Sequence, residues 1–234
     1  WEEPGMCYFR IRVKGDPEYM GTESHPDRPY RVLTDTARII MALDKWSQEF
    51  REKAKGGTYR PSMAIGSVRA GAPHKPNWSP AISEIFLDMR PAPWTSPSEI
   101  NHIFHDVMTR ILKDNPGMNA EWDMFVSVPG GRTDPNNWII QSAIRAAQAV
   151  EGTDEDIYEG RGAGQTEAGI LRTWGIPTAR VSGAPPNPEL PADLRQGFTM
   201  SGAYGPNIVK AAQAISYSII DTLTRSREEV GLEY

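Results

Sequence analysis

The stretch Gly71–Pro93, with the sequence GAPHKPNWSPAISEIFLDMRPAP, decides the local fold of this chain. Prolines crowd its first part and predict a turn around Asn77. Its second part alternates apolar and polar residues with the period of a half-buried strand. The two predicted faces of this strand carry Ile85, Leu87 and Met89, and Glu84, Phe86, Asp88 and Arg90, respectively.

Asn77 and Arg90 make the stretch a candidate anion site. An amide donates a hydrogen bond without adding charge, and a guanidinium binds a carboxylate through two parallel bonds. Both side chains are expected on the same side of one sheet, which suits a carboxylate or a tetrahedral oxyanion. A structural interpretation stays open, with Arg90 paired to its own sheet neighbours and Asn77 holding the turn.

The composition is that of a globular protein that buries a core in one or two domains. The chain has 234 residues, 39% hydrophobic and 24% charged, with a formal net charge of -5. The absence of a long basic run argues against a nucleic-acid partner, and no apolar run reaches the ~18 residues of a membrane span. The single cysteine, Cys7, excludes an internal disulfide and favours a reducing compartment, with the cytoplasm as the default.

The first half of the chain is predicted to form a small two-layer α+β unit. Period-2 alternation indicates strands, and apolar residues at helical spacing indicate helices, the second of which is capped by Ser96. The expected order is strand, helix, strand, strand, helix, over 7–13, 32–51, 62–68, 81–90 and 97–115.

The second half is predicted to be part of a layered α/β domain, which places a boundary between 1–117 and 118–234. A strand over 122–128, a helix over 135–150 and a Gly-rich turn over 160–167 come first. The run 176–181 is rich in β-forming residues and predicts a buried parallel strand. The last helix, from Pro206 to about Ser226, carries an apolar stripe formed by Ile208, Ala212, Ile215, Ile219 and Leu223.

The Gly-rich turn is a second candidate binding element. Backbone N–H groups at the start of a helix can bind an anion, and Thr166 and Glu167 lie where a side chain could face a cleft. A plain structural turn explains the same residues equally well. All four histidines lie in the first half. His102 and His105, three apart on a predicted helix, leave a zinc pair open, but a solvated helix face is the favoured interpretation.

These motifs together resemble the binuclear-metal hydrolases that include acetylornithine deacetylase, succinyl-diaminopimelate desuccinylase, aminoacylases and glutamate carboxypeptidases. The resemblance covers nearly the whole chain. In the first half, AIGSVRAG (64–71), NWSP (77–80) and DMR (88–90) are similar to the family's Gly-rich strand, Asn-x-x-Pro turn and Asp-x-Arg strand end. In the second half, GQTEAGILR (164–172) and GIPT (175–178) are similar to its Gly-x-(Ser/Thr)-Asp turn, helix and Gly-Ile-Pro strand.

The resemblance implies a lid, or dimerisation, domain over 1–117 and the C-terminal part of a catalytic domain over 118–234. It also implies a divalent metal (zinc, manganese or cobalt) that activates water for attack on an amide carbonyl, with a glutamate as general base. The implied substrate is a small molecule with a carboxylate. The lid is expected to pair with itself in a homo-oligomer.

Roles carry over to the residues that match these motifs. Asn77 and Arg90 would contact the substrate or the oxyanion, and Arg69 is a weaker candidate. Thr166 and Glu167, together with Gly164, would form the floor of the cleft.

Three departures from the family pattern stand out. The usual lid histidine falls at Tyr19, with His25 six residues on as a substitute. The segment 199–204, which ends at Tyr204, occupies the place of the last metal-binding histidine. The first metal ligands precede the lid in the family, so we expect an N-terminal half as a partner and interpret Trp1 as a cut or processed end.

Three functions stay open from the sequence. The first is an amide hydrolase for N-acyl amino acids or short peptides. The second is an aminohydrolase for an aromatic amino acid such as a nitroanthranilate, because Tyr19, Trp78 and Tyr204 suit stacking on a ring. The third is a non-catalytic relative used for dimerisation or ligand binding.

Overall fold

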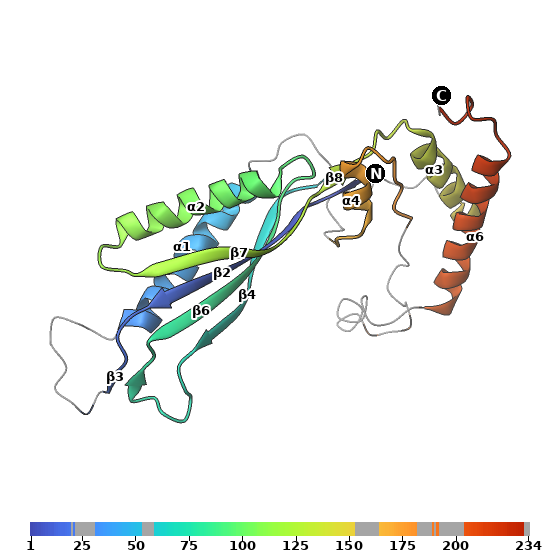
Figure 1. Cartoon of the computed structure of the whole chain (residues 1–234). Coiled ribbons are helices and arrows are strands. Elements are labelled where there is room, and N and C mark those ends of the chain that lie inside the picture. The colour runs from blue at the N-terminus through green and yellow to red at the C-terminus, as the bar shows by residue number, and fades with distance from the viewer. Residues whose placement is uncertain are drawn as a thin grey trace. The chain divides into compact units, whose positions relative to one another are not determined.

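The computed structural model describes residues 1–19, 21, 31–52, 59–152, 164–181, 189, 191 and 204–231 (Figure 1). The chain divides into two compact units. The sheet unit comprises 2–131 and 159–173, and the helical unit comprises Trp1, 132–158 and 174–234.

An antiparallel sheet of four strands forms the centre of the sheet unit. Its strands are β2 (Met6–Lys14), β4 (Ser62–Ala70), β6 (Ile82–Arg90) and β7 (Ala120–Val128), in the order β4-β6-β2-β7. Phe9 of β2 pairs with Leu87 of β6 in this register. Burial alternates residue by residue along both strands, which confirms the two faces that the sequence predicts.

Two helices, α1 (Arg31–Glu52) and α2 (Pro97–Asp114), cover one face of the sheet (Figure 1). The hydrophobic core lies between the helices and the strands, where the rings of Phe9 and Phe104 are 4.1 Å apart. The hydroxyl of Ser96 accepts a hydrogen bond from the backbone N–H of Glu99 at 3.2 Å and caps α2 as predicted. The predicted two-layer unit is therefore confirmed.

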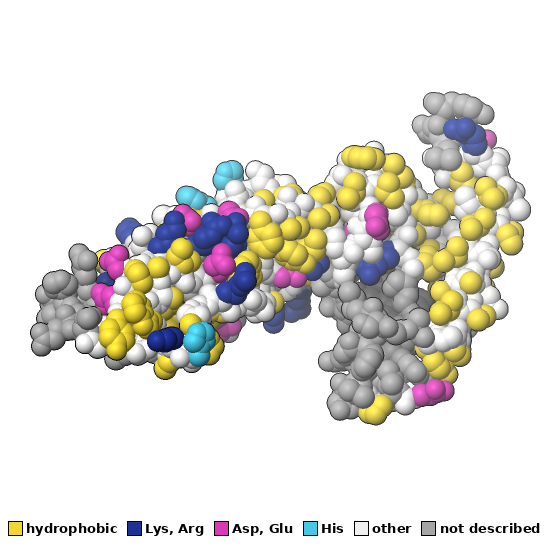
Figure 2. Space-filling view, turned by 60° about the horizontal axis from the view of Figure 1, so that its bottom comes forward, with side chains coloured by type: hydrophobic (Ala, Val, Ile, Leu, Met, Phe, Trp, Pro, Cys, Tyr) yellow, Lys and Arg dark blue, Asp and Glu magenta, His cyan; other side chains and the backbone are white. Residues whose placement is uncertain are grey.

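The other face of the sheet carries interleaved charges. Arg10 donates two hydrogen bonds to Asp123, at 3.1 and 3.0 Å, and Arg12 lies within 3.5 Å of both Glu84 and Glu121. Figure 2 shows basic and acidic side chains side by side on a face of this unit. Exposed pairs of this kind add little stability, so we assign them to the specificity of strand pairing and to solubility.

The sheet continues beyond Gly117, where the sequence places a change of domain, because β7 forms its fourth strand. Two smaller sheets, each of two strands, lie at the two ends of this unit. One pairs β1 (Glu2–Glu3) with β8 (Gly131–Arg132), and the other pairs β3 (Glu18–Tyr19) with β5 (Trp78–Ser79).

The helical unit is built on α3 (Trp138–Glu151) and α6 (Gly205–Leu223). The indole of Trp138 donates to the hydroxyl of Thr222 at 3.1 Å, and Arg145 donates to Asp221 at 2.6 Å. These polar contacts link the two helices.

The prediction of a strand over 176–181 is wrong for the structure described. These residues form no strand, although the hydroxyl of Thr133 bonds both the N–H and the C=O of Thr178, at 3.0 and 3.1 Å. A strand needs a neighbour for its backbone groups, and the described residues supply no neighbouring strand here. Among the described helices, none has the length and apolar character required to cross a membrane.

Candidate functional site

Arg90 lies at the C-terminal end of β6 and is held by Asp88 on the same strand. Its Nε and Nη2 atoms donate to the two carboxylate oxygens of Asp88 at 2.7 and 2.8 Å. Burial works against the charge of Arg90, but the bonds and the negative charge of Asp88 outweigh it and raise the pKa of the guanidinium. The guanidinium is therefore a fixed cation with a fixed orientation.

Glu3 is a buried carboxylate that the sequence did not single out. Its side chain is 1% exposed and accepts hydrogen bonds from the N–H groups of Thr166 and Gly169, at 3.0 and 3.1 Å, and from the Thr166 hydroxyl at 2.5 Å. Three donors compensate for the loss of water around the carboxylate. No local pattern could reveal this role, because the donors lie 163 and 166 positions away along the chain.

The turn that leads into α4 (Ala168–Thr173) is fixed by these bonds. The Thr166 hydroxyl also accepts a hydrogen bond from the N–H of Ala168 at 3.3 Å. A Cβ atom on Gly169 would lie 2.7 Å from the carbonyl oxygen of Pro129 and 2.9 Å from Glu3, so only glycine fits. Thr166 is thus a positioning residue in this structure, whereas the predicted floor residues Gly164 and Glu167 are exposed.

Arg90 and the Thr166 turn occupy the same end of the sheet unit. The N–H of Gly5 donates to the carbonyl of Pro91 at 3.2 Å, which links the end of β6 to the segment that carries Glu3. We call this end, defined by Glu3, Arg90 and Thr166, the anchored end.

Asn77 and Tyr19 lie at the opposite end of the sheet. Asn77 is half-buried in the turn before β5, and Tyr19 of β3 pairs with Trp78 of β5, with the two exposed rings 5.4 Å apart. Arg69 is also near this end, exposed and 3.8 Å from Glu84. We call this end, defined by Tyr19, Asn77 and Trp78, the lid tip.

One chain cannot bring Asn77 and Arg90 onto the same small ligand. The nine residues of β6 separate them, which at about 3.3 Å per residue amounts to roughly 25–30 Å. The expected clamp is therefore split between the two ends of the sheet. The remaining predicted site residues are Tyr204, which belongs to the helical unit and donates to Glu189 at 3.4 Å, and His25, which lies outside the described residues.

The described residues do not form a metal centre. No group of three or more His, Cys, Asp or Glu side chains comes together among them, and the oxygens of Glu3 are already bound by three donors. The described residues therefore do not by themselves fit the divalent metal that the family resemblance implies.

The fold defined by these elements is a two-layer α+β unit followed by a helical unit. Comparison with solved structures places this fold among amidases and dipeptidases. No protein-family model matches the sequence.

Three solved structures illustrate the likeness. A hydantoinase/carbamoylase family amidase from Burkholderia ambifaria has a TM-score of 0.62 and 17% identity, over 94% of this chain and 47% of the amidase. Human carnosine dipeptidase 1 has a TM-score of 0.53 and 13% identity, over 76% of this chain and 47% of the dipeptidase. The dipeptidase Dug1p from Saccharomyces cerevisiae has a TM-score of 0.54 and 13% identity, over the same shares of the two chains. At these identities the likeness is one of fold, and this chain spans about half the length of these enzymes.

Proposed function

We propose that this chain supplies the substrate-clamping lid and part of the cleft of a hydrolase that cleaves an amide C–N bond. The proposed substrate is an N-acyl amino acid or a short peptide with a free carboxylate. The observation that carries the proposal is the likeness to an amidase over 94% of the chain, which includes both compact units. The order of sequence motifs supports the same class of enzyme.

Arg90 is the proposed carboxylate-binding residue. The side-on pair with Asp88 fixes the plane of its guanidinium before a substrate arrives, so less side-chain entropy is lost on binding. The Thr166 turn, held by Glu3, would form the adjoining wall of the cleft.

The lid tip is proposed to act on a second copy of the chain. Because Asn77 and Arg90 lie a strand length apart, the amide of one chain would complete the site that contains Arg90 of another. A closed homo-oligomer with two-fold symmetry would make this exchange reciprocal.

The family resemblance supports a divalent metal, zinc, manganese or cobalt, held mainly by an N-terminal half of the enzyme. That half is the proposed partner of the residues described above. The cytoplasm is the proposed location, since the single thiol of Cys7 suits a reducing compartment.

An aromatic substrate is the second candidate function. The Tyr19–Trp78 pair presents two exposed rings next to Asn77, and such rings can stack on an aromatic amino acid. An aminohydrolase for a nitroanthranilate would use this pair, whereas a peptide hydrolase would not need it.

Turnover assays on the intact enzyme separate these functions. We expect hydrolysis of N-acetyl amino acids or dipeptides, abolished by a chelator, and a KM for carboxylate substrates that rises roughly tenfold or more in Arg90→Lys. For substrate analogues in which an amide replaces the carboxylate, Arg90→Lys should have the same KM as the unchanged enzyme. Turnover of nitroanthranilates alone would favour the second function, and stoichiometric metal without turnover of either class would contradict both.

A further inference from the structure

Helix α6 leaves its apolar stripe largely exposed, although it packs against α3. Its hydrogen bonds to α3 involve only polar residues of α6, namely Ser218, Asp221 and Thr222. Ala214 is its only buried residue. The stripe predicted from the sequence is instead exposed, with Ile219 at 50% and Leu223 at 79%. A globular domain normally buries such a stripe, so α3 covers it only in part.

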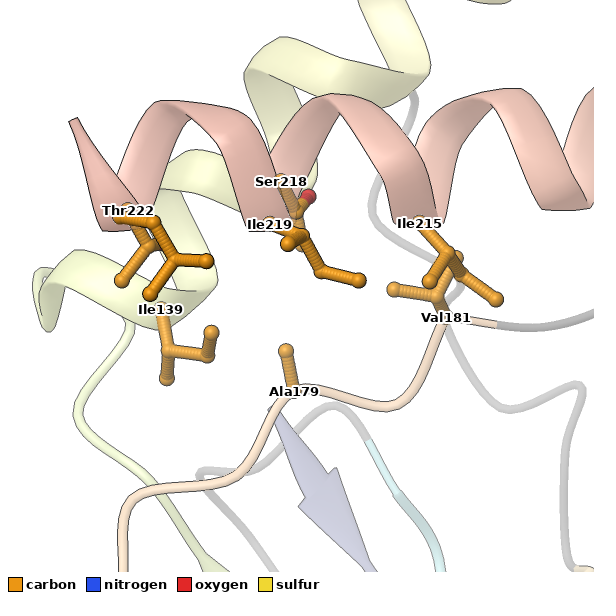
Figure 3. A pocket seen from close by; sticks show the side chains of 9 residues that line it. Ile139, Ala179, Val181, Ile215, Ser218, Ile219 and Thr222 are labelled. Atoms are coloured by element: carbon orange, nitrogen blue, oxygen red, sulfur yellow. The ribbon is translucent and has the colours of Figure 1, made fainter.

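A pocket of about 480 Å³ lies along this stripe. Figure 3 shows Ile215 and Ile219 of α6 on one side, facing Ala179 and Val181 of the run 176–181 on the other. Only two of the nine lining residues carry a side-chain hydroxyl, Ser218 and Thr222. The pocket therefore resembles the inside of a protein core from which one layer has been removed.

The run 176–181 has the sequence of a buried strand without a neighbouring strand among the described residues. A helix facing a strand-like run across an apolar gap is the layer order of an α/β domain. The solved amidase that matches 94% of this chain is about twice as long, because the match covers only 47% of it. In that amidase, a further stretch of polypeptide about as long as this chain could therefore supply the missing layer.

We propose that Ile215, Ile219 and Leu223, together with Ala179 and Val181, form a docking surface for the rest of the layered α/β domain. The occupant is a polypeptide segment outside these 234 residues that adds a strand beside 176–181 and inserts apolar side chains under α6. This inference rests on the proposed function for the identity of the occupant. It adds the surface through which the two halves associate.

Photo-crosslinking in the intact protein tests the proposal. A benzophenone amino acid replaces Ile219 in one variant and Met41 in a control variant, Met41 being 73% exposed on α1. We expect adducts from position 219 to map to peptides outside the 234 residues, at least tenfold more abundant than any from position 41. Mixing with an isotopically labelled copy identifies adducts between two copies of this chain.

Three results would overturn the proposal. They are adducts from position 219 to residues of a labelled second copy, adducts to a small apolar molecule, and a position 219 that forms no adduct. A second pair of variants tests the surface without the crosslinker. Ile219→Asp should lower the yield of the assembled protein at least tenfold, and Met41→Asp should not. Turnover is measured on the same preparations. An active enzyme in which position 219 forms no adduct refutes only the docking surface. An inactive protein in which position 219 crosslinks to peptides outside the 234 residues refutes only the proposed function.

Discussion

The carboxylate of Glu3 holds Thr166 by two hydrogen bonds, to its N–H at 3.0 Å and to its hydroxyl at 2.5 Å, across 163 positions of sequence. This contact joins the N-terminal strand of the chain to the turn before α4. It sets the position of a turn that the family resemblance assigns to the floor of the cleft.

Replacement of Glu3 by alanine should lower the free energy of unfolding by about 2–4 kcal/mol, because the buried N–H groups of Thr166 and Gly169 lose their acceptor. Urea denaturation followed by circular dichroism measures this change. Glu49→Gln on the exposed side of α1 is the control, with an expected change within about 0.5 kcal/mol. Equal stability of Glu3→Ala and the control would show that the contact is not structural.

Gly169 should not tolerate a side chain. In Gly169→Ala the new methyl group would meet the Pro129 carbonyl and the Glu3 carboxylate, so we expect a loss of about 1–3 kcal/mol in the free energy of unfolding. Gly205→Ala is the matched control, since a Cβ there meets no atom within 4 Å. Thermal unfolding of both variants makes the comparison, and a melting temperature of Gly169→Ala at or above that of Gly205→Ala would refute the packing argument.

Cys7 should make stability fall at high pH. Burial, followed by the charge of Asp88, raises the pKa of its thiol from 9.0 to about 11. The raised pKa favours the protonated thiol in the folded state, so its contribution is complete below pH 9 and is lost between about pH 9 and 11. This loss amounts to about 2–3 kcal/mol in the free energy of unfolding, and Cys7→Ser or Cys7→Ala should abolish it.

Thiol labelling gives an independent check on Cys7. The native chain should react with a maleimide at pH 7.5 far more slowly than the urea-unfolded chain, because the side chain is fully buried. Equal labelling rates in the two states would contradict both the burial and the pH prediction.

Mixed oligomers should show that the lid tip acts on a second copy. Asn77→Ala and Arg90→Ala should each impair turnover strongly when all copies carry the same change. A mixed dimer of the two variants, isolated with two different tags, combines an intact Arg90 with an intact Asn77 in one of its two sites. We expect it to regain about half of the wild-type activity. Activity no higher than that of the parent variants would place both residues in one chain's site.

Much of the sheet unit follows from the sequence alone. The alternation along β2 and β6 predicts which side chains are buried, because a strand presents successive residues to opposite faces. Ser96 predicts the start of α2 for an equally local reason. The strand predicted over 176–181 failed, because pairing depends on a neighbour that a local pattern does not specify.

The sequence by itself determined the periodic elements, the two-layer unit that they build and the motifs that resemble a hydrolase, since all of these depend on residues close together along the chain. Only the tertiary structure decided three further points. Glu3 anchors the Thr166 turn through long-range hydrogen bonds, and Asp88 occupies the guanidinium of Arg90. The straight run of β6 then holds Asn77 and Arg90 a strand length apart, because hydrogen bonding to both neighbouring strands keeps it extended.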